Sequence, residues 1–149
     1  MELLERIERL IRRKDICVLA TAGSGGPHTS LMAYSCSPET LHLYMLTPMR
    51  SLKYRNILEN PIVSLLIDTR EESAREQVVA LTISAKAIEI TDPLRRRSIA
   101  ANLSSRHPQL RPFTQLEQMA VLQVVPAAFQ LQDGVARSHY LAAGTAERL

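Results

Sequence analysis

Six segments dense in β-forming residues, joined mostly by short turns, constrain this 149-residue chain more than any other feature. β-Branched and aromatic residues are frequent in them, and the longest segment alternates apolar with polar residues as half-buried strands do. We expect strands at 16–22, 28–35, 41–46, 62–68, 78–91 and 120–126 with 129–132. A parallel sheet needs a helix after nearly every strand, and that pattern is missing. The sequence therefore predicts a mainly β protein built on an antiparallel sheet.

Helices are predicted at three places around these strands. Residues 2–14 carry apolar side chains at helical spacing and charges elsewhere, which indicates an amphipathic helix that covers the sheet. A short basic helix is expected within 47–61, and Asp92-Pro93 opens a third helix that runs to about Leu103. Short turns and helices in these places suggest a small antiparallel barrel with helical plugs. At this length we expect a single domain over residues 1–149.

Composition narrows the function classes. The net charge of +3 and the pI of about 9.1 suit an anionic partner. Aromatic residues make up only 4% and tryptophan is absent, which argues against a base-stacking nucleic-acid platform. Cys17 and Cys36 form no CxxC motif, and the four histidines show no metal-ligand spacing. From these spacings we expect no metal site. No apolar run approaches 18 residues, so we also expect no membrane span and a cytoplasmic protein.

The stretch TPMRSLKYRNILENP, residues 47–61, combines a helix start with a local excess of positive charge. Thr47 is a good N-cap residue and Pro48 fits the first helical position, so the helix is predicted to begin here. The free N–H groups and positive dipole of a helix start attract anions, and Arg50, Ser51 and Lys53 add donors. A phosphate monoester suits this chemistry because it carries about −1.5 to −2 charges and three acceptor oxygens. The alternative is a surface helix that happens to be basic.

With its flanks, LHLYMLTPMRSLKYRNILENPIVSLLID resembles the flavin-binding segment of the pyridoxamine-5'-phosphate-oxidase-like split-barrel family. That segment runs strand, T-x-x-x-S-x-K, helix, N-P, strand, and Thr47, Ser51, Lys53 and Asn60-Pro61 hold those positions here. GPHTSLMAYS is similar to the family's second strand, and ALTISAKAIEITD to its long fifth strand. The resemblance implies a six-stranded antiparallel split barrel of the FMN-binding type. It also implies a homodimer that binds two FMN molecules at the subunit interface.

The resemblance assigns candidate cofactor residues by position. Thr47, Arg50, Ser51 and Lys53 would hold the FMN phosphate. The flavin ring would be lined, largely through backbone groups, by Thr29, Ser30, Leu31, Met32, Met45 and Leu46. No side chain is an evident acid or base, so no catalytic residue is named.

Departures from the family pattern argue against its eponymous reaction. The true oxidases carry an Arg and, five residues on, a Lys that grips the substrate phosphate, and Ser30 and Ser35 stand there in this chain. The usual Gly of the fifth strand is Ala85, and the preceding Gln falls on Ala80. The tryptophan-bearing C-terminal segment is absent. We therefore expect the fold and FMN without oxidation of pyridoxamine phosphate.

Three functional hypotheses follow. The first is an FMN-dependent oxidoreductase that passes electrons from a reduced donor such as NAD(P)H to a small organic acceptor. The second is a non-catalytic FMN- or haem-binding carrier or sensor. DGVARSHYL is similar to the ending of the family's haem-utilisation branch, with Val135 in place of the usual Phe, and His139 would be the iron ligand. The third is a barrel that binds nucleic acid through Arg50, Lys53, Arg55 and the arginines at 95–97, which the scarcity of aromatics disfavours.

Overall fold

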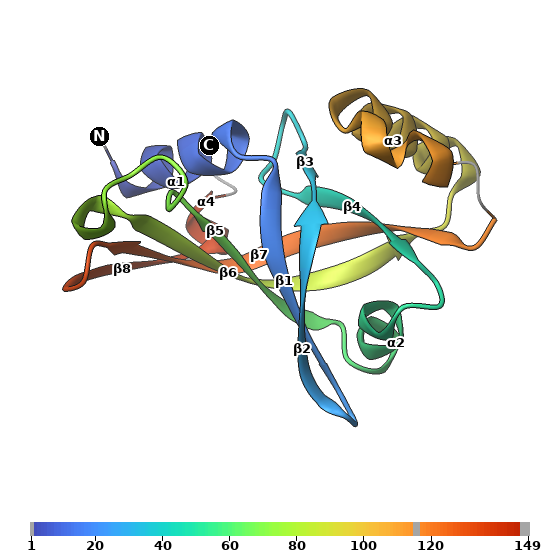
Figure 1. Ribbon diagram of the computed structural model, residues 1–149, viewed down its shortest axis with the longest axis horizontal. Helices are drawn as coiled ribbons and strands as arrows, with labels where there is room; N and C mark the ends of the chain where they lie inside the picture. Colours follow the sequence, from blue (N-terminus) through green and yellow to red (C-terminus); the bar gives the residue numbers. More distant parts are fainter. Residues whose placement is uncertain (1, 115–116, 147–149) are drawn as a thin grey trace.

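A single curled antiparallel sheet forms the body of the protein in the computed structural model, which describes residues 2–114 and 117–146 (Figure 1). Its strands are β1 (Ile16–Gly23), β2 (Gly26–Ala33), β3 (Ser35–Cys36), β4 (Leu43–Pro48), β5 (Ile62–Asp68), β6 (Val79–Ile90), β7 (Met119–Asp133) and β8 (Arg137–Ala142). They lie in the order β2-β1-β5-β6-β7-β4-β3, and β8 pairs with β7. Every pairing is antiparallel, which confirms the predicted mainly β class and the split-barrel fold.

Strand β7 is the element on which the other strands converge. Its first half pairs with β4, its second half pairs with β8, and β6 pairs with it from Val121 to Asp133. The sequence predicts an interruption near Pro126, but the strand continues through it because the β6–β7 register shifts there, between Ser84 and Ala85. The extra residue at this bulge is Ala127, since Pro126 faces Ala85 and Ala128 faces Ser84. Proline lacks a backbone N–H, so a bulge is one of the few places where it does not break a ladder.

Two strands were not predicted from the sequence. β3 has only two residues, Ser35 and Cys36, which is too short for any periodic signal. β8 lies in the tail after Gly134, and almost all of its side chains are exposed, so it lacks the alternation of a half-buried strand. Both lie at the margins of the sheet, where pairing with β4 and β7 creates the strand.

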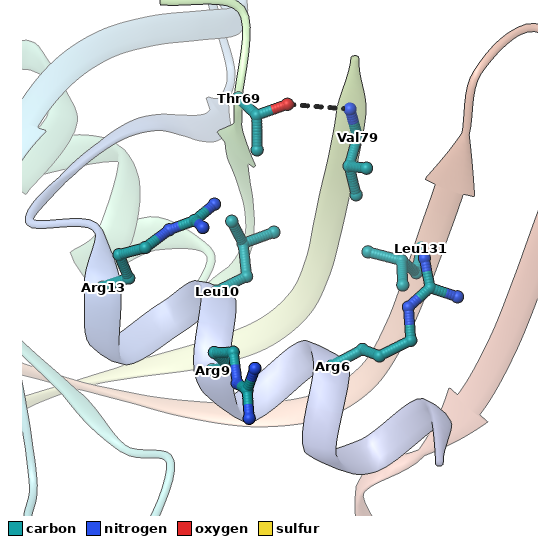
Figure 2. A pocket seen from close by; sticks show the side chains of 7 residues that line it. All are labelled: Arg6, Arg9, Leu10, Arg13, Thr69, Val79 and Leu131. Atoms are coloured by element: carbon teal, nitrogen blue, oxygen red, sulfur yellow. Dashed lines mark hydrogen bonds between the residues drawn. The ribbon is translucent and has the colours of Figure 1, made fainter. Parts of the chain in front are cut away.

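The helices lie around the sheet rather than in layers with it (Figure 1). They are α1 (Leu3–Arg13), α2 (Leu52–Glu59), α3 (Pro93–Arg106) and α4 (Ala143–Ala146), with 3₁₀ turns at η1 (Arg75–Gln77) and η2 (Pro108–Phe113). The apolar face of α1 is buried as predicted, and Leu10 packs in the core with Leu131, with Val79 beside them (Figure 2). Among the described helices, none is long and apolar enough to cross a membrane.

The core has two parts because β4 presents different residues to its two faces. Leu43 and Met45 are fully buried in the large cluster inside the curled sheet, with residues of β1, β5, β6, β7 and α1. Leu46 belongs instead to a smaller cluster with Leu103 of α3 and Val121 of β7. Thus α3 covers one face of β4, while the inner face of β4 closes the barrel.

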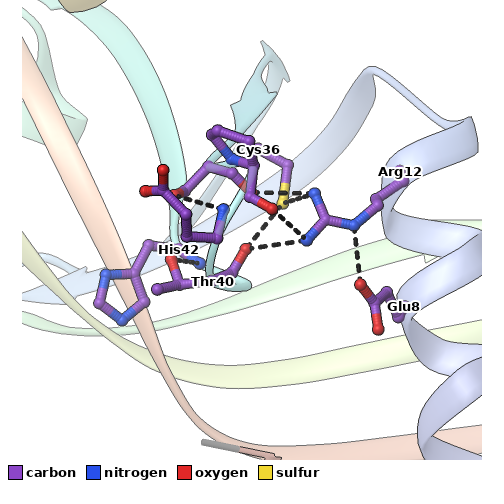
Figure 3. A network of polar contacts seen from close by, with 8 residues as sticks. Glu8, Arg12, Cys36, Thr40 and His42 are labelled. Atoms are coloured by element: carbon purple, nitrogen blue, oxygen red, sulfur yellow. Dashed lines mark hydrogen bonds and ion pairs between the residues drawn. The ribbon is translucent and has the colours of Figure 1, made fainter. Parts of the chain in front are cut away.

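Arg12 joins α1 to the β3–β4 turn (Figure 3). Its guanidinium group donates to the carbonyl oxygens of Ser37 at 2.9 Å and Thr40 at 3.2 Å, and its Nε donates to Glu8 at 2.9 Å. The Cys36 thiol lies 3.6 Å from the same guanidinium group and 3.5 Å from the Thr40 carbonyl. A planar fork with several donors can satisfy these acceptors together, whereas a lysine ammonium cannot.

We predict that Arg12→Ala lowers the free energy of unfolding by about 1–3 kcal/mol, because the turn carbonyls lose charge-assisted hydrogen bonds. Arg12→Lys should recover only part of this loss. Urea unfolding monitored by circular dichroism checks this: the midpoint urea concentration should fall while the m-value stays the same. Arg95→Ala, an exposed position on α3, is the matched control. Equal midpoints for Arg12→Ala and the control would contradict the proposed clamp.

Candidate functional site

The segments that the sequence assigns to the flavin lie at the two ends of the sheet. β2 is the first strand of the sheet order, and β4 lies next to its last strand. Helix α2 contacts β1, β2 and β4, and it lies beside them at one end of the molecule (Figure 1). The curl of the sheet thus brings β2, β4 and the start of α2 into one region, which we call the seam.

Helix α2 begins at Leu52, and its N-cap is Ser51 rather than the predicted Thr47. Thr47 and Pro48 instead remain in β4, where they face Ala120 and Met119 of β7. The reason is long-range: β4 continues to pair with β7 for two residues beyond the segment expected from the sequence. A tight turn then leads into the helix.

The Ser51 hydroxyl holds the start of α2, and it uses its one proton and both of its acceptor sites to do so. Its hydroxyl donates to the Pro48 carbonyl at 2.7 Å and accepts from the Tyr54 N–H at 3.2 Å. The Thr47 hydroxyl lies 3.1 Å away, and it must be the donor because the Ser51 proton is already used. Thr47 is fully buried, so it acts on the corner through Ser51.

The remaining donors of the corner are free to bind an anion. Within the described part of the chain, the N–H groups of Leu52 and Lys53 have no protein acceptor. Lys53 is half-buried on the first turn of α2, and its ammonium makes no hydrogen bond or ion pair to the described residues. Exposed Arg50 donates from Nε to the Gln118 side chain at 2.8 Å, which leaves its terminal nitrogens available. The corner therefore offers two amides and two cations without a carboxylate among their hydrogen-bond partners.

The candidate ring-lining residues do not share one face, because successive side chains of a strand point to opposite sides. On β2, Thr29 and Leu31 are exposed on the outer face, whereas Met32 is buried and Ser30 is half-buried on the inner face. On β4, Met45 is buried inside the barrel. The Leu46 side chain lines a separate cleft of about 390 Å³ beneath α3, together with Arg96 and Arg97. Only backbone groups of these strands, or one alternate set of side chains, can therefore meet a flat ring.

Two polar contacts that the sequence did not reveal hold α2 against the sheet. The Tyr54 hydroxyl donates to the Glu89 carboxylate of β6, and this hydrogen bond raises the pKa of Tyr54. Asn56, a buried polar residue, donates to the Thr21 hydroxyl of β1 at 3.1 Å. The sequence offered one signal for these contacts, which is the polar Asn56 next to the apolar Ile57 on the inward-facing side of the helix. These contacts fix the direction of α2 and hence the direction of its free amides.

The titratable groups with shifted pKa values offer no nucleophile or base. Burial raises the pKa of the Cys17 thiol to about 12, which disfavours the reactive thiolate. Burial also raises the pKa of Cys36 and of Tyr34. The Tyr34 hydroxyl donates to the Ile11 carbonyl at 2.7 Å, which is a structural role. In the described ranges no group of three or more His, Cys, Asp and Glu side chains is arranged to hold a metal ion.

We predict that Ser51→Ala lowers the free energy of unfolding by about 0.5–2 kcal/mol, the usual cost of losing an N-cap. Ser51→Asn should keep most of the stability because its amide oxygen can accept from the same N–H. Thermal or urea unfolding of the two variants side by side checks this. If the two variants were equally stable, the cap would not lie at Ser51.

Comparison with known proteins places this geometry in a family. The sequence profile described as pyridoxamine 5'-phosphate oxidase matches residues 3–133. No curated protein matches the sequence significantly.

Solved structures share the fold at low identity. HutZ, the haem storage protein from Vibrio cholerae, is 22% identical with a TM-score of 0.72, over 90% of this chain and 96% of its own. A putative pyridoxamine 5'-phosphate oxidase from Listeria innocua is 22% identical with a TM-score of 0.68, over 89% and 98%. A haem-binding protein from Mycobacterium smegmatis is 16% identical with a TM-score of 0.83. The match covers 99% of this chain and 60% of that protein. By its sequence profile and its fold, this chain belongs to the pyridoxamine 5'-phosphate oxidase family.

Proposed function

We propose that the protein binds FMN, with the phosphate at the corner where β4 gives way to α2. The observation that carries this proposal is the pair of free amides at Leu52 and Lys53, held in place by the Ser51 cap next to the Lys53 ammonium. A helix start with these donors suits a group with three acceptor oxygens and about −1.5 to −2 charges. Buried Thr47 and fully bonded Ser51 act as positioning residues rather than direct ligands, which refines the role that the sequence suggests.

The ring of the cofactor fits the seam on chemical grounds. Backbone groups of β2 and β4 border it, and a ring-binding site needs mainly apolar surface with a few fixed polar groups. Leu31 and Thr29 supply exposed apolar and hydroxyl surface beside the backbone of β2. The contacts of Tyr54 and Asn56 keep α2 from moving relative to this surface.

Bound FMN supplies hydride and electron transfer, and the chain supplies binding and orientation. We propose a cytoplasmic oxidoreductase that takes electrons from a reduced donor such as NAD(P)H and delivers them to a small organic acceptor. Oxidation of pyridoxamine phosphate is disfavoured because Ser30 and Ser35 stand where the resemblance expects an Arg and a Lys. Ser35 is moreover buried, so it offers no surface to a phosphorylated substrate.

We further propose a homodimer with FMN at the subunit interface. The outer face of β1, β2 and β5 supports it, because this face carries the apolar residues Ile16, Val18, Ala20, Leu31 and Leu66. Charged residues, among them Asp68 and Arg70, border it at one side. Leu31 is 72% exposed and Ile16 is 46% exposed, although both lie in paired strands. A second copy would bury this surface and would cover a ring held against β2.

A carrier without turnover is the second candidate, and two observations favour it. Two solved structures with this fold are named as haem-binding or haem storage proteins. His139 is exposed on β8, where an imidazole has access to an iron centre. The visible spectrum of the purified protein separates the cofactors, since flavin and haem absorb in different bands. Aerobic consumption of NADH or NADPH then separates an enzyme from a carrier.

We predict that Lys53→Ala weakens FMN binding by about 1.5–3 kcal/mol, the range for a hydrogen bond to a charged group. Quenching of flavin fluorescence gives the Kd. Arg55→Ala is the matched control, because Arg55 is an exposed cation on the same helix and changes the net charge equally. Equal weakening in both variants would mean that the loss of positive charge alone causes the effect. An unchanged Kd for Lys53→Ala would contradict the proposed phosphate site.

We predict that Leu31→Glu converts the dimer to a monomer, because it places a charge in the proposed interface. Leu94→Glu on α3 is the matched control, since both leucines are 72% exposed. Sedimentation velocity measures the mass of each variant. A Leu31→Glu protein that sediments as the wild type does would exclude this face as the interface.

A further inference from the structure

Three arginines of α1 face one cleft, far from the seam. Arg6, Arg9 and Arg13 are spaced i, i+3 and i+7, which places them along one side of the helix. The cleft holds about 200 Å³, and its other lining residues are Leu10, Thr69, Val79 and Leu131. Figure 2 shows the guanidinium groups of Arg6 and Arg13 on either side of Leu10, with Thr69 and Val79 above it in the view and the guanidinium group of Arg9 below it.

The charges in and around the cleft are unbalanced. None of its lining residues is acidic. Outside the lining, Arg6 pairs with Asp133 of β7, and Arg13 pairs with Glu72 in the β5–β6 loop. Glu72 is shared, since Lys14 also reaches it at 3.2 Å. Across the described part of the chain, Arg9 has no hydrogen bond or ion pair from its side chain.

This arrangement differs from an ordinary solvated helix face. Opposite charges at i, i+3 and i, i+4 stabilise a helix, and like charges at those spacings cost free energy. Here arginines stand three and four residues apart, so like charges are neighbours on the helix. The two ion pairs hold Arg6 and Arg13 in place on both sides of Arg9. The floor beneath them is apolar, so an anion bound there would be partly shielded from water and would interact more strongly with the guanidinium groups.

We propose that this cleft binds the phosphate group of a small phosphomonoester, with the organic part on the floor formed by Leu10, Val79 and Leu131. Guanidinium forks match phosphate oxygens in bidentate geometry. Arg9 is the fork with no carboxylate partner among the described residues, and Arg6 and Arg13 add positive charge at the two ends of the cleft. The volume of about 200 Å³ lies below that of sites for drug-sized ligands, which favours a small phosphomonoester. The site is separate from the proposed FMN corner, because α1 and α2 lie at different ends of the molecule (Figure 1).

The test is a titration of the full-length, FMN-treated protein with phenyl phosphate and with inorganic phosphate, followed by amide chemical shifts. Ionic strength is held constant with chloride. Saturable shifts are expected at Leu10, Thr69, Val79 and Leu131. Arg9→Gln should weaken binding about tenfold or more, because one charge-assisted contact is lost. It should leave FMN binding and both ion pairs unchanged, since Arg9 takes part in neither.

Arg95→Gln on α3 removes the same charge far from the cleft and should bind as the wild type does. Tighter binding of phenyl phosphate identifies an ester as the ligand type, and equal binding identifies the phosphate group alone. Shifts at Leu52 and Lys53 report the FMN corner separately, so either site can fail without the other. No saturable shifts around the cleft, or equal affinity for wild type and Arg9→Gln, would overturn the proposal.

Discussion

The pairing of β7 with three other strands is the constraint on which the remaining structure depends. Fifteen residues of continuous strand allow β4 and β8 to share one side of β7 while β6 occupies the other. The bulge at Ala127 divides these two halves and accommodates Pro126, which has no backbone N–H to donate. Bulged strands bend and twist more strongly, which gives the sheet the curl that a barrel needs. β2 and β4 approach one another only because of this curl.

The pairing of β4 with β7 also determines which groups the seam presents. β4 follows β7 as far as Pro48, and the Met49 N–H continues the contact by donating to the Gln118 carbonyl at 2.8 Å. The chain must then turn at once, and Ser51 is the first residue free to cap a helix. Its hydroxyl accepts from the Tyr54 N–H, and the amides of Leu52 and Lys53 have no acceptor among the described residues. The proposed anion site at this corner therefore depends on where β4 stops pairing with β7.

The sequence predicts the elements whose signal is local. The periodicity of Ile7 and Leu10 defined α1, and the density of β-formers located every long strand. It wrongly placed the cap at Thr47 instead of Ser51, because both are good caps and the choice depends on how far β4 pairs with β7. It missed β8 for the same reason, since pairing alone makes that exposed segment a strand. The arginine cleft was also hidden, because Val79 and Leu131 of its floor lie more than fifty positions away from the arginines along the chain.

A crystal structure of the protein with FMN tests the central claim most directly. The account predicts phosphate oxygens within hydrogen-bonding distance of the Leu52 and Lys53 amides and of the Lys53 ammonium, with the ring along β2. A structure in which the phosphate lies elsewhere while these amides bind only solvent would contradict it.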